Sequence, residues 1–476
     1  MGTPKGFVQV KASTAIYRDK NERVNDYDEV EIILSDEKII EQTSRCMDCG
    51  IPFCHGSGCP LGNLIPEWNE YAFSGHWKEA LEVLLSTDDF PEFTGRVCPA
   101  LCEGSCTAGL HIDPVSIRQI ELALVEKGFR EGWITPQIPN IRTGKKVAVI
   151  GSGPAGLSTA SRLNKMGHSV TVYERDNHAG GLLRYGIPDF KLQKKVVQRR
   201  IELMKAEGIT FETGVDAGVD ITANFLLKKF DVVCITIGAK APRDINIKGR
   251  NLNGIHFAME FLTMQNKHIN NENLPAPLID AKNKNVLVIG GGDTGSDCVG
   301  TSNRHGAKSV TQIEIMPQPP EARSPNTPWP LWPYRLRTSS SHKEGCNRMW
   351  SIQTKEFLGE NGVLKGIKAV KVEWNFSESG TPLGFKEIEG SEFIIDADLI
   401  FLSMGFTGVE KIEILNQFGA EIDKRGNVKV NANFSLSSHP NVFAAGDGVS
   451  GASLVVRAME AGKITAKHID AYLKGI

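Results

Sequence analysis

Residues 146–174 read KVAVIGSGPAGLSTASRLNKMGHSVTVYE, which predicts an apolar strand, a glycine turn, a helix and a second strand. The turn carries Gly151, Gly153 and Gly156 as G-x-G-x-x-G, directly after the strand. In this arrangement glycine allows a tight turn, close approach of the backbone to a pyrophosphate, and close helix–strand packing. Glu174 ends the second strand, where a carboxylate can accept hydrogen bonds from ribose hydroxyls. The stretch therefore predicts a βαβ dinucleotide-binding unit.

The same pattern returns 139 residues later. Residues 285–314 read NVLVIGGGDTGSDCVGTSNRHGAKSVTQIE, with Gly290, Gly292 and Gly295 in the turn and Glu314 at the end of the second strand. The helix after each turn offers unpaired N–H groups and a partial positive charge to phosphates. A unit of this kind can exist without its ligand, but two intact copies in one chain favour two nucleotide sites.

A third motif lies near the C-terminus, where residues 439–451 read HPNVFAAGDGVSG ahead of an expected closing helix. Two glycine turns followed by a late AAGD resemble the two-dinucleotide-binding flavoprotein reductases. That resemblance implies FAD at the first unit, a nicotinamide nucleotide at the second, and Gly446 and Asp447 beside the flavin. A helix starting near Ser453 would direct its N-terminus to the isoalloxazine ring, where reduced flavin develops negative charge. A plain turn aspartate is the alternative at Asp447.

The size and composition of the chain fit a globular protein of several domains. Its 476 residues correspond to roughly three domains of about 150 residues. Apolar residues make up 41% and charged residues 23%, which excludes a disordered chain. The net charge of -2 gives no long-range attraction to nucleic acid. No apolar run approaches the roughly 20 residues of a membrane span and no secretion signal is recognised, so a cytoplasmic protein is expected.

The cysteines are concentrated near the N-terminus. Seven of the 10 cysteines are Cys46, Cys49, Cys54, Cys59, Cys98, Cys102 and Cys106. Without a sign of secretion, this density indicates metal or cluster ligation rather than disulfides. The isolated Cys234 and Cys298 are interpreted as small buried hydrophobes. Because no C-x-x-C stands beside the expected flavin, electrons would leave it through the N-terminal cysteines.

The cysteine spacing favours iron–sulfur clusters over zinc. Structural zinc sites commonly pair two C-x2-C knuckles, whereas only Cys46 and Cys49 have that spacing. Proline follows Cys59 and Cys98, as in ferredoxin-like runs whose neighbouring cysteines serve different clusters. Seven cysteines cannot fill the eight positions of two four-iron clusters, so either one ligand is not cysteine or there is a single cluster. We expect two 4Fe-4S clusters, with zinc as the alternative.

Four stretches together resemble one family over essentially the whole chain. They are GTPKGF, NEYAFSGHWKEALEVLLSTDDFPEFTGRVCPALCEGSC, GGLLRYGIPDFKL and IMPQPPEARSPNTPWPLWP, at residues 2–7, 69–106, 180–192 and 315–333. They are similar to the small (β) subunit of bacterial-type glutamate synthase. Dihydropyrimidine dehydrogenase, ferredoxin:NADPH transhydrogenase and sulfide dehydrogenase subunits share the same cluster-plus-reductase module.

The family resemblance implies interleaved cluster ligation. One cluster would be held by Cys46, Cys49, Cys54 and Cys106. The other would be held by Cys59, Cys98, Cys102 and a non-cysteine ligand, seven residues after the proline of a P-x-x-I helix start. In this sequence that position is Glu121, after Pro114. A carboxylate is a hard iron ligand whose charge should shift the cluster potential. A solvated helix glutamate is the alternative.

The resemblance also assigns residues to the two nucleotides. For FAD the expected site comprises Gly151, Gly153, Gly156, Glu174, Gly181, Leu182, Lys191, Gly446 and Asp447. For NAD(P)H it comprises Gly290, Gly292, Asp293, Thr294, Gly295, Glu314, Ser403, Met404 and Gly405. No acid or base catalyst is expected, because the protein positions the two rings and tunes their potentials.

The function implied by the resemblance is electron input to glutamate synthase. NAD(P)H would reduce FAD, and the two clusters would carry single electrons to the FMN of a large subunit that makes L-glutamate from L-glutamine and 2-oxoglutarate. Nothing in this chain predicts that second chemistry: there is neither an amidotransferase nucleophile nor a TIM-barrel repeat. One alternative is an electron-transfer subunit for another partner, of the dihydropyrimidine dehydrogenase, sulfide dehydrogenase or transhydrogenase type. A non-catalytic assembly module is the other.

Glu314 favours NADH over NADPH as the coenzyme. A carboxylate at the end of the second strand accepts hydrogen bonds from a free 2′-hydroxyl and repels a 2′-phosphate. The next arginine is Arg323. However, Arg323, or Arg335 and Arg337, could fold back over a phosphate, so the preference is modest.

The expected fold class is α/β, with two Rossmann-like domains preceded by a mainly helical iron–sulfur domain. The expected domains are 1–143 for the clusters, 144–275 and 403–476 for FAD, and 276–402 for NAD(P)H. A Pro-rich linker is expected at 133–144. Within the first domain an apolar stripe at helical spacing is expected to pack in the core, at Trp68, Tyr71, Ala72, Trp77, Ala80, Leu81 and Leu84.

Overall fold

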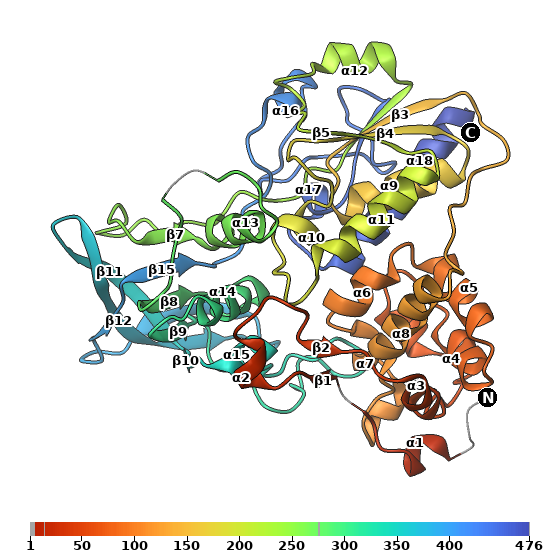
Figure 1. Ribbon diagram of the computed structural model, residues 1–476. Helices are drawn as coiled ribbons and strands as arrows, with labels where there is room; N and C mark the ends of the chain where they lie inside the picture. The colour runs from red at the N-terminus through yellow and green to blue at the C-terminus, as the bar shows by residue number, and fades with distance from the viewer. Residues whose placement is uncertain (1–4, 14, 275–276, 476) are drawn as a thin grey trace.

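The computed structural model describes residues 5–13, 15–274 and 277–475. The expected boundary between residues 275 and 276, and the beginning of the stretch 2–7, lie outside these ranges. Figure 1 shows a helical N-terminal part beside two parts that are each built around a parallel sheet. This is the expected α/β class.

The N-terminal part is mainly helical. Its helices are α1 (Gly6–Gln9), α2 (Lys20–Arg23), α3 (Asp36–Thr43), η1 (Cys54–Gly58), α4 (Ile65–Phe73), α5 (Trp77–Thr87), α6 (Pro91–Val97), α7 (Leu101–Gly104), η2 (Thr107–Leu110) and α8 (Ile117–Arg130). The short strands β1 (Ile16–Tyr17) and β2 (Glu31–Ile32) pair antiparallel. Trp68 and Leu84 of the predicted stripe are fully buried, whereas Tyr71 is 42% exposed. Gly75, with φ 80°, ends α4 and turns the chain, so the stripe is not one continuous helix face.

The first parallel sheet contains the first glycine motif. Its strand order is β16-β6-β3-β4-β5. The bounds are β3 (Lys146–Ile150), β4 (Ser169–Glu174), β5 (Thr210–Thr213), β6 (Val232–Ile235) and β16 (Val442–Ala444). Its helices are α9 (Pro154–Lys165), α10 (Leu182–Tyr185), α11 (Lys194–Ala206), α12 (Ala223–Lys229), α16 (Glu413–Gln417), α17 (Asp447–Ser450) and α18 (Val455–Lys474). The C-terminal segment thus returns to this sheet through β16.

The second parallel sheet contains the repeated glycine motif, with strand order β10-β9-β8-β15-β7. Its strands are β7 (Ile255–Phe257), β8 (Asn285–Ile289), β9 (Ser309–Ile313), β10 (Asn347–Met349) and β15 (Leu399–Leu402), and its helices are α13 (Ala258–Ile269), α14 (Asp293–Arg304) and α15 (Ser340–Glu344). Because β7 pairs with β15, the chain enters this part before residue 255. The expected FAD segment 144–275 therefore extends too far, since a three-residue strand gives almost no sequence signal.

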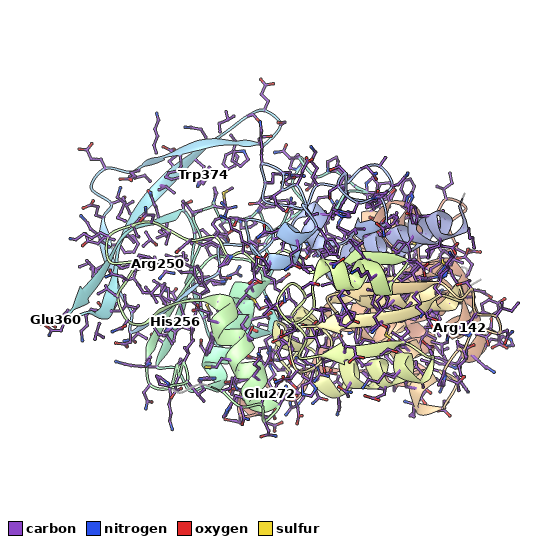
Figure 2. All side chains as sticks on the ribbon, turned by 90° about the horizontal axis from the view of Figure 1, so that it is seen from above. Arg142, Arg250, His256, Glu272, Glu360 and Trp374 are labelled. Atoms are coloured by element: carbon purple, nitrogen blue, oxygen red, sulfur yellow. The ribbon has the colours of Figure 1, made fainter. Side chains whose placement is uncertain are left out.

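An antiparallel sheet, which the sequence did not predict, extends the second part. It consists of β11 (Ile352–Glu360), β12 (Val363–Phe376), β13 (Pro382–Glu387) and β14 (Phe393–Asp396), with β12 in the middle. Figure 2 places Glu360 and Trp374 at the end of the molecule opposite Arg142. The core under β11 and β12 includes Phe357 and Ile367, so the sheet is packed onto the parallel sheet.

The longest helix, α18, packs against α9 at the centre of the first part. Gly462 makes the contact possible, since a Cβ there would overlap the carbonyl oxygen of Ala155. The helix ends at Gly475, which has a φ of 73°; a glycine in this left-handed conformation commonly ends a helix. Among the described residues, no helix combines the length and the apolar character that crossing a bilayer requires.

Candidate functional site

A large cavity of about 280 Å³ opens above the first glycine turn. It is lined by the turn itself, the end of β4, the start of α10 and the segment before α18, so elements far apart in the sequence meet there. The predicted FAD residues that line it are Gly151, Gly153, Glu174, Gly181, Leu182 and Asp447.

Each glycine of the first turn has a different structural role. Gly151 has φ 99°, and a Cβ on it would lie 2.6 Å from the carbonyl oxygen of Thr236. A Cβ on Gly156 would lie 2.7 Å from Thr236 Oγ1, so the third glycine allows the helix to pack on the strands. Gly153 faces open space and lines the large cavity. Gly181, with φ 52°, lies directly against Gly153. The turn therefore presents bare backbone to a ligand.

Two carboxylates, those of Glu174 and Asp447, line the large cavity. Glu174 accepts a hydrogen bond from the backbone N–H of Ser152 at 3.1 Å and from that of Asp176 at 3.0 Å. Asp447 accepts one from Ser453 Oγ at 2.6 Å, and burial raises the pKa of this carboxyl. Both side chains are thus held in place and available to polar groups of a dinucleotide. Gly446 precedes Asp447 with φ 73°, where a Cβ would lie 2.6 Å from that of Ala155.

The N-terminus of α18 also meets the large cavity. Leu454 and Val455 line it, and the first turn of the helix carries no acidic residue. The unpaired N–H groups and the partial positive charge of a helix start are therefore available to stabilise negative charge on a bound ring.

A smaller pocket adjoins the large cavity from the second part. Pro242, Phe257 and three predicted nicotinamide-side residues line it, namely Ser403, Met404 and Gly405. Met259, Thr294 and Phe406 line both spaces, so these side chains are shared walls. Ser403 Oγ is buried and has no hydrogen-bond partner, so a polar ligand group would satisfy it. The residues predicted for the flavin and those predicted for the nicotinamide therefore line adjoining spaces.

The second glycine turn is supported by a hydrogen-bond chain. Gln312 Nε2 donates to the carbonyl oxygen of Gly290 at 2.8 Å, and His342 Nε2 lies 2.7 Å from Gln312 Oε1. A Cβ on Gly295 would lie 2.6 Å from Gln312 Nε2, so glycine is required there. Gly292 faces open space, and Asp293 begins α14 behind it.

Glu314 lies against this turn. A side chain on Gly291 would collide with the Glu314 carboxylate, which places that carboxylate over the glycine loop. Burial raises the pKa of Glu314, and Arg348 opposes this. Arg337 stacks on Trp332 at 3.7 Å, and Arg323 Nη2 donates to the Gly104 carbonyl oxygen at 2.7 Å.

Lys191 is not at the wall of the large cavity. Its amino group pairs with Asp297 of α14, which does line that cavity. The pair therefore connects the first part to the second directly beside the expected flavin.

Four of the predicted cluster cysteines surround one cavity. We call Cys46, Cys49, Cys54 and Cys106 the first thiol group; all four line it. Burial raises the pKa of Cys46 to about 12, and each thiolate would raise that of its neighbours further. Such thiols become stable anions only when a metal compensates their charge, so the donor set fits a cluster.

The second thiol group consists of Cys59, Cys98 and Cys102. Burial raises the pKa of Cys59 and of Cys98 to about 12, and the charge of Glu121 raises all three. Glu121 is therefore close enough to act electrostatically on all three thiols. Among the described residues, no three Cys, His, Asp or Glu side chains are placed to hold a single metal ion.

Glu121 is buried rather than solvated, at 6% exposure. Thr94 Oγ1 donates to Glu121 Oε1 at 2.6 Å, and Asn63 Nδ2 to its Oε2 at 3.5 Å. Burial and the nearby Asp88 raise its pKa well above the usual value. No sequence pattern pointed to Thr94, Asn63 or Asp88, because they become neighbours of Glu121 only through folding.

Two family models cover most of the chain. The model described as "Pyridine nucleotide-disulphide oxidoreductase" matches residues 145–462. The model described as dihydropyrimidine dehydrogenase domain II, 4Fe-4S cluster, matches residues 23–133. The 4Fe-4S match coincides with the part that carries both thiol groups.

Solved structures support the fold. FprA from Mycobacterium tuberculosis in complex with NADPH superimposes with a TM-score of 0.55 at 19% identity, covering 70% of this chain and 85% of that one. At this identity the likeness concerns the fold of the two nucleotide-binding parts.

Curated relatives extend over the whole chain. The glutamate synthase [NADPH] small chain of Mycobacterium tuberculosis is 47% identical over 95% of this chain and 92% of its own length. That of Bacillus subtilis is 46% identical over 100% and 99%. Glutamate synthase [NADH] of Schizosaccharomyces pombe is 45% identical over 99% of this chain, which spans 23% of that protein. The chain is an NAD(P)H-dependent iron–sulfur flavoprotein oxidoreductase and belongs to the family of glutamate synthase small chains.

Proposed function

We propose that this chain is the electron-input subunit of a glutamate synthase. It would oxidise NAD(P)H at the smaller pocket and deliver electrons through two 4Fe-4S clusters to the FMN of a large subunit, which makes L-glutamate from L-glutamine and 2-oxoglutarate. The observation that carries this proposal is the adjacency of the large cavity and the smaller pocket through Met259, Thr294 and Phe406. FAD, when bound, supplies the conversion of a two-electron hydride into single electrons.

The protein's contribution is to bind and orient. The first turn and Gly181 present bare backbone to the pyrophosphate, while Glu174 and Asp447 accept hydrogen bonds from hydroxyl groups. Three other expected FAD residues do not line the cavity. Gly156 and Gly446 allow close packing, and Lys191 pairs with Asp297 of the second part. The apolar side chains of the shared wall, Met259 and Phe406, exclude water from the contact between the rings.

The two thiol groups are proposed as the ligands of two clusters. The first would use its four cysteines, and the second its three cysteines with Glu121. In support, Glu121 is buried, its charge acts on all three cysteines of the second group, and its oxygens accept hydrogen bonds from the neutral side chains of Thr94 and Asn63. A buried carboxylate next to three thiols is better accounted for by a bound cation than by solvent.

We propose NADH as the preferred coenzyme, on the basis of Glu314. Its carboxylate lies over the glycine turn, where an adenosine ribose is expected. The relatives divide on this point: the bacterial small chains are named for NADPH and the fungal proteins for NADH. The choice therefore needs measurement.

The partner is proposed from the fungal relatives. There the matched region is about a quarter of a single chain named glutamate synthase. For the present chain, the rest of the glutamate synthase would be a separate, larger FMN protein in the cytoplasm. A different electron acceptor and a non-catalytic assembly role are the competing functions.

The test is reconstitution with a co-purified or co-expressed large subunit. Anaerobically purified protein should contain about eight irons and one FAD, and NADH should bleach the flavin without any partner. With the large subunit, NADH oxidation should depend on both L-glutamine and 2-oxoglutarate. Stoichiometric zinc without labile sulfide would contradict the two iron–sulfur clusters. If NADH did not bleach the flavin, the non-catalytic assembly role would be favoured. Bleaching without glutamate formation would indicate a different electron acceptor.

A further inference from the structure

The loop between α10 and α11 contacts both other parts of the molecule. The backbone N–H of Val30 donates to the Phe190 carbonyl oxygen at 2.9 Å, and that of Gln193 donates to Glu29 Oε1 at 3.0 Å. On its other side Lys191 pairs with Asp297 of α14. The N-terminal part, the first sheet part and the second sheet part therefore meet at this loop.

A buried charge triad lies next to the loop. Glu344 of α15 pairs with Arg23 of α2 (Nε to Oε1, 2.7 Å) and with Arg304 of α14 (Nη1 to Oε2, 2.7 Å). The side chains of Glu344 and Arg304 are 0% exposed and that of Arg23 is 4% exposed. Figure 1 shows α2 lying against α15. Because a buried charge that loses its partner is strongly unfavourable, the two segments are held together firmly.

Arg304 joins all three parts. Its Nε donates to the carbonyl oxygen of Asp26 at 2.9 Å, and its guanidinium lies 3.8 Å from the centre of the Phe190 ring. With the Glu344 contact, one planar group touches the N-terminal part, the first sheet part and its own part. Arginine combines stacking with several fixed donors, which lysine does not.

Phe190 packs closely against the backbone of α14 at Gly300. A Cβ on Gly300 would lie 2.8 Å from Phe190 Cζ and 2.5 Å from Ser341 Oγ. Asp297, three residues before Gly300 on α14, lines the large cavity, and Thr294 lines both the cavity and the smaller pocket. A displacement of α14 from the loop would therefore move the wall between the two rings.

We propose that residues 18–31, the loop 186–193 and helices α14 and α15 form a three-domain junction that holds the nicotinamide pocket against the flavin cavity, with Arg304 as the positioning residue. The junction adds no chemical step to the established oxidoreductase activity. It fixes the distance over which hydride moves, and a misplacement of about 1 Å can cost on the order of 100-fold in rate. The iron–sulfur part thus helps to build the site that reduces the flavin.

The experiment measures the limiting rate of flavin bleaching by NADH in anaerobic stopped-flow, with the full-length holoprotein. Arg304→Met should lower this rate at least tenfold, with less than a threefold change in the coenzyme Kd, and Arg304→Lys should recover part of the loss. Arg130→Met is the matched control: Arg130 belongs to the same N-terminal part and pairs with Asp36 and Glu131, but its side chain is 60% exposed. The control should keep the wild-type rate.

Arg23→Met provides an independent variant if Arg304→Met does not fold. Within the triad, this substitution removes only the ion pair between the N-terminal part and Glu344. It should lower the limiting rate at least threefold in protein that retains FAD and iron. Hydrogen exchange should increase in residues 340–344 and not in 146–174. A limiting rate within twofold of wild type in a flavin-loaded variant of either arginine would overturn the proposal, because a merely structural role lowers the yield of holoprotein and leaves its rate unchanged.

Discussion

Lys463 Nζ donates a hydrogen bond to the carbonyl oxygen of Leu61 at 3.3 Å, two residues after Cys59. The same amino group donates to the Thr87 carbonyl oxygen. Lys463 is on α18, whose first residue lines the large cavity, and the two positions are about 12 Å apart along the helix axis. One helix therefore connects the expected flavin to the loop that carries Cys59 of the second thiol group.

Replacing this lysine should uncouple the two sites. Lys463→Met removes the donor from the Leu61 carbonyl group and one of two donors from that of Thr87, which also accepts from Arg162, and this costs about 1–3 kcal/mol of stability. Cluster reduction by NADH, followed by freeze-quench EPR, should slow while flavin bleaching persists. Lys467→Ala, an exposed change on the same helix, is the control. Equal cluster reduction rates in the two variants would rule out this coupling.

The second thiol group should be essential for outward transfer only. Cys59→Ser and Cys102→Ser should lower the iron content by about half and abolish NADH-dependent reduction of the partner. Reduction of the flavin by NADH should remain, because neither residue lines the large cavity. Transfer to the partner that survives both substitutions would refute the relay.

Coenzyme choice should depend on Glu314. Wild-type protein should have a higher kcat/KM for NADH than for NADPH, and Glu314→Ala should reduce the ratio by about tenfold, as expected for loss of roughly 1.4 kcal/mol of selective binding. Diaphorase assays with both coenzymes measure the ratio. A wild type that prefers NADPH, unchanged by the substitution, would show that another residue selects the coenzyme.

His342 should make the second part sensitive to acid. Burial lowers its pKa to about 4, and its Nδ1 accepts from the Ser339 N–H at 3.2 Å, so a proton on Nδ1 would break this hydrogen bond and leave a charge on a largely buried ring. Since the folded state prefers neutral His342, its contribution is complete above the unfolded pKa of about 6.5 and is lost as pH falls toward 4. With partial solvent screening this amounts to about 1–2 kcal/mol. Urea unfolding at pH 7 and pH 5 should show a smaller difference for His342→Gln than for wild type.

Gly462 should be intolerant of substitution. Gly462→Ala forces α18 away from α9, which should cost about 1–3 kcal/mol and weaken FAD retention, because the start of α18 lines the large cavity. Thermal melting and flavin content after gel filtration measure both effects. Unchanged melting would mean that the helices separate without cost.

Local sequence patterns predicted the two βαβ units and a cluster-binding role for the seven N-terminal cysteines. Such patterns are recognisable because glycine turns and runs of ligand residues are short and have strict steric or chemical requirements. The membership of β7 in the second sheet and the sheet around β12 did not follow from the sequence, since both depend on pairings between distant strands. Of the candidate site, the cavity-lining glycines were recognisable. Met259 and Phe406 were not, because an ordinary apolar residue becomes a shared wall only through the docking of two parts.

The edge strand β16 has a consequence for biosynthesis. It pairs with β6, so that Val442 lies opposite Val233, and the sheet that holds the first glycine turn lacks this strand until residues 442–444 have been made. The second sheet, by contrast, is complete once β15 has left the ribosome. Domains generally fold as units during synthesis. The coenzyme-binding part should therefore fold first on the ribosome, and the flavin should enter only after β16 has been made.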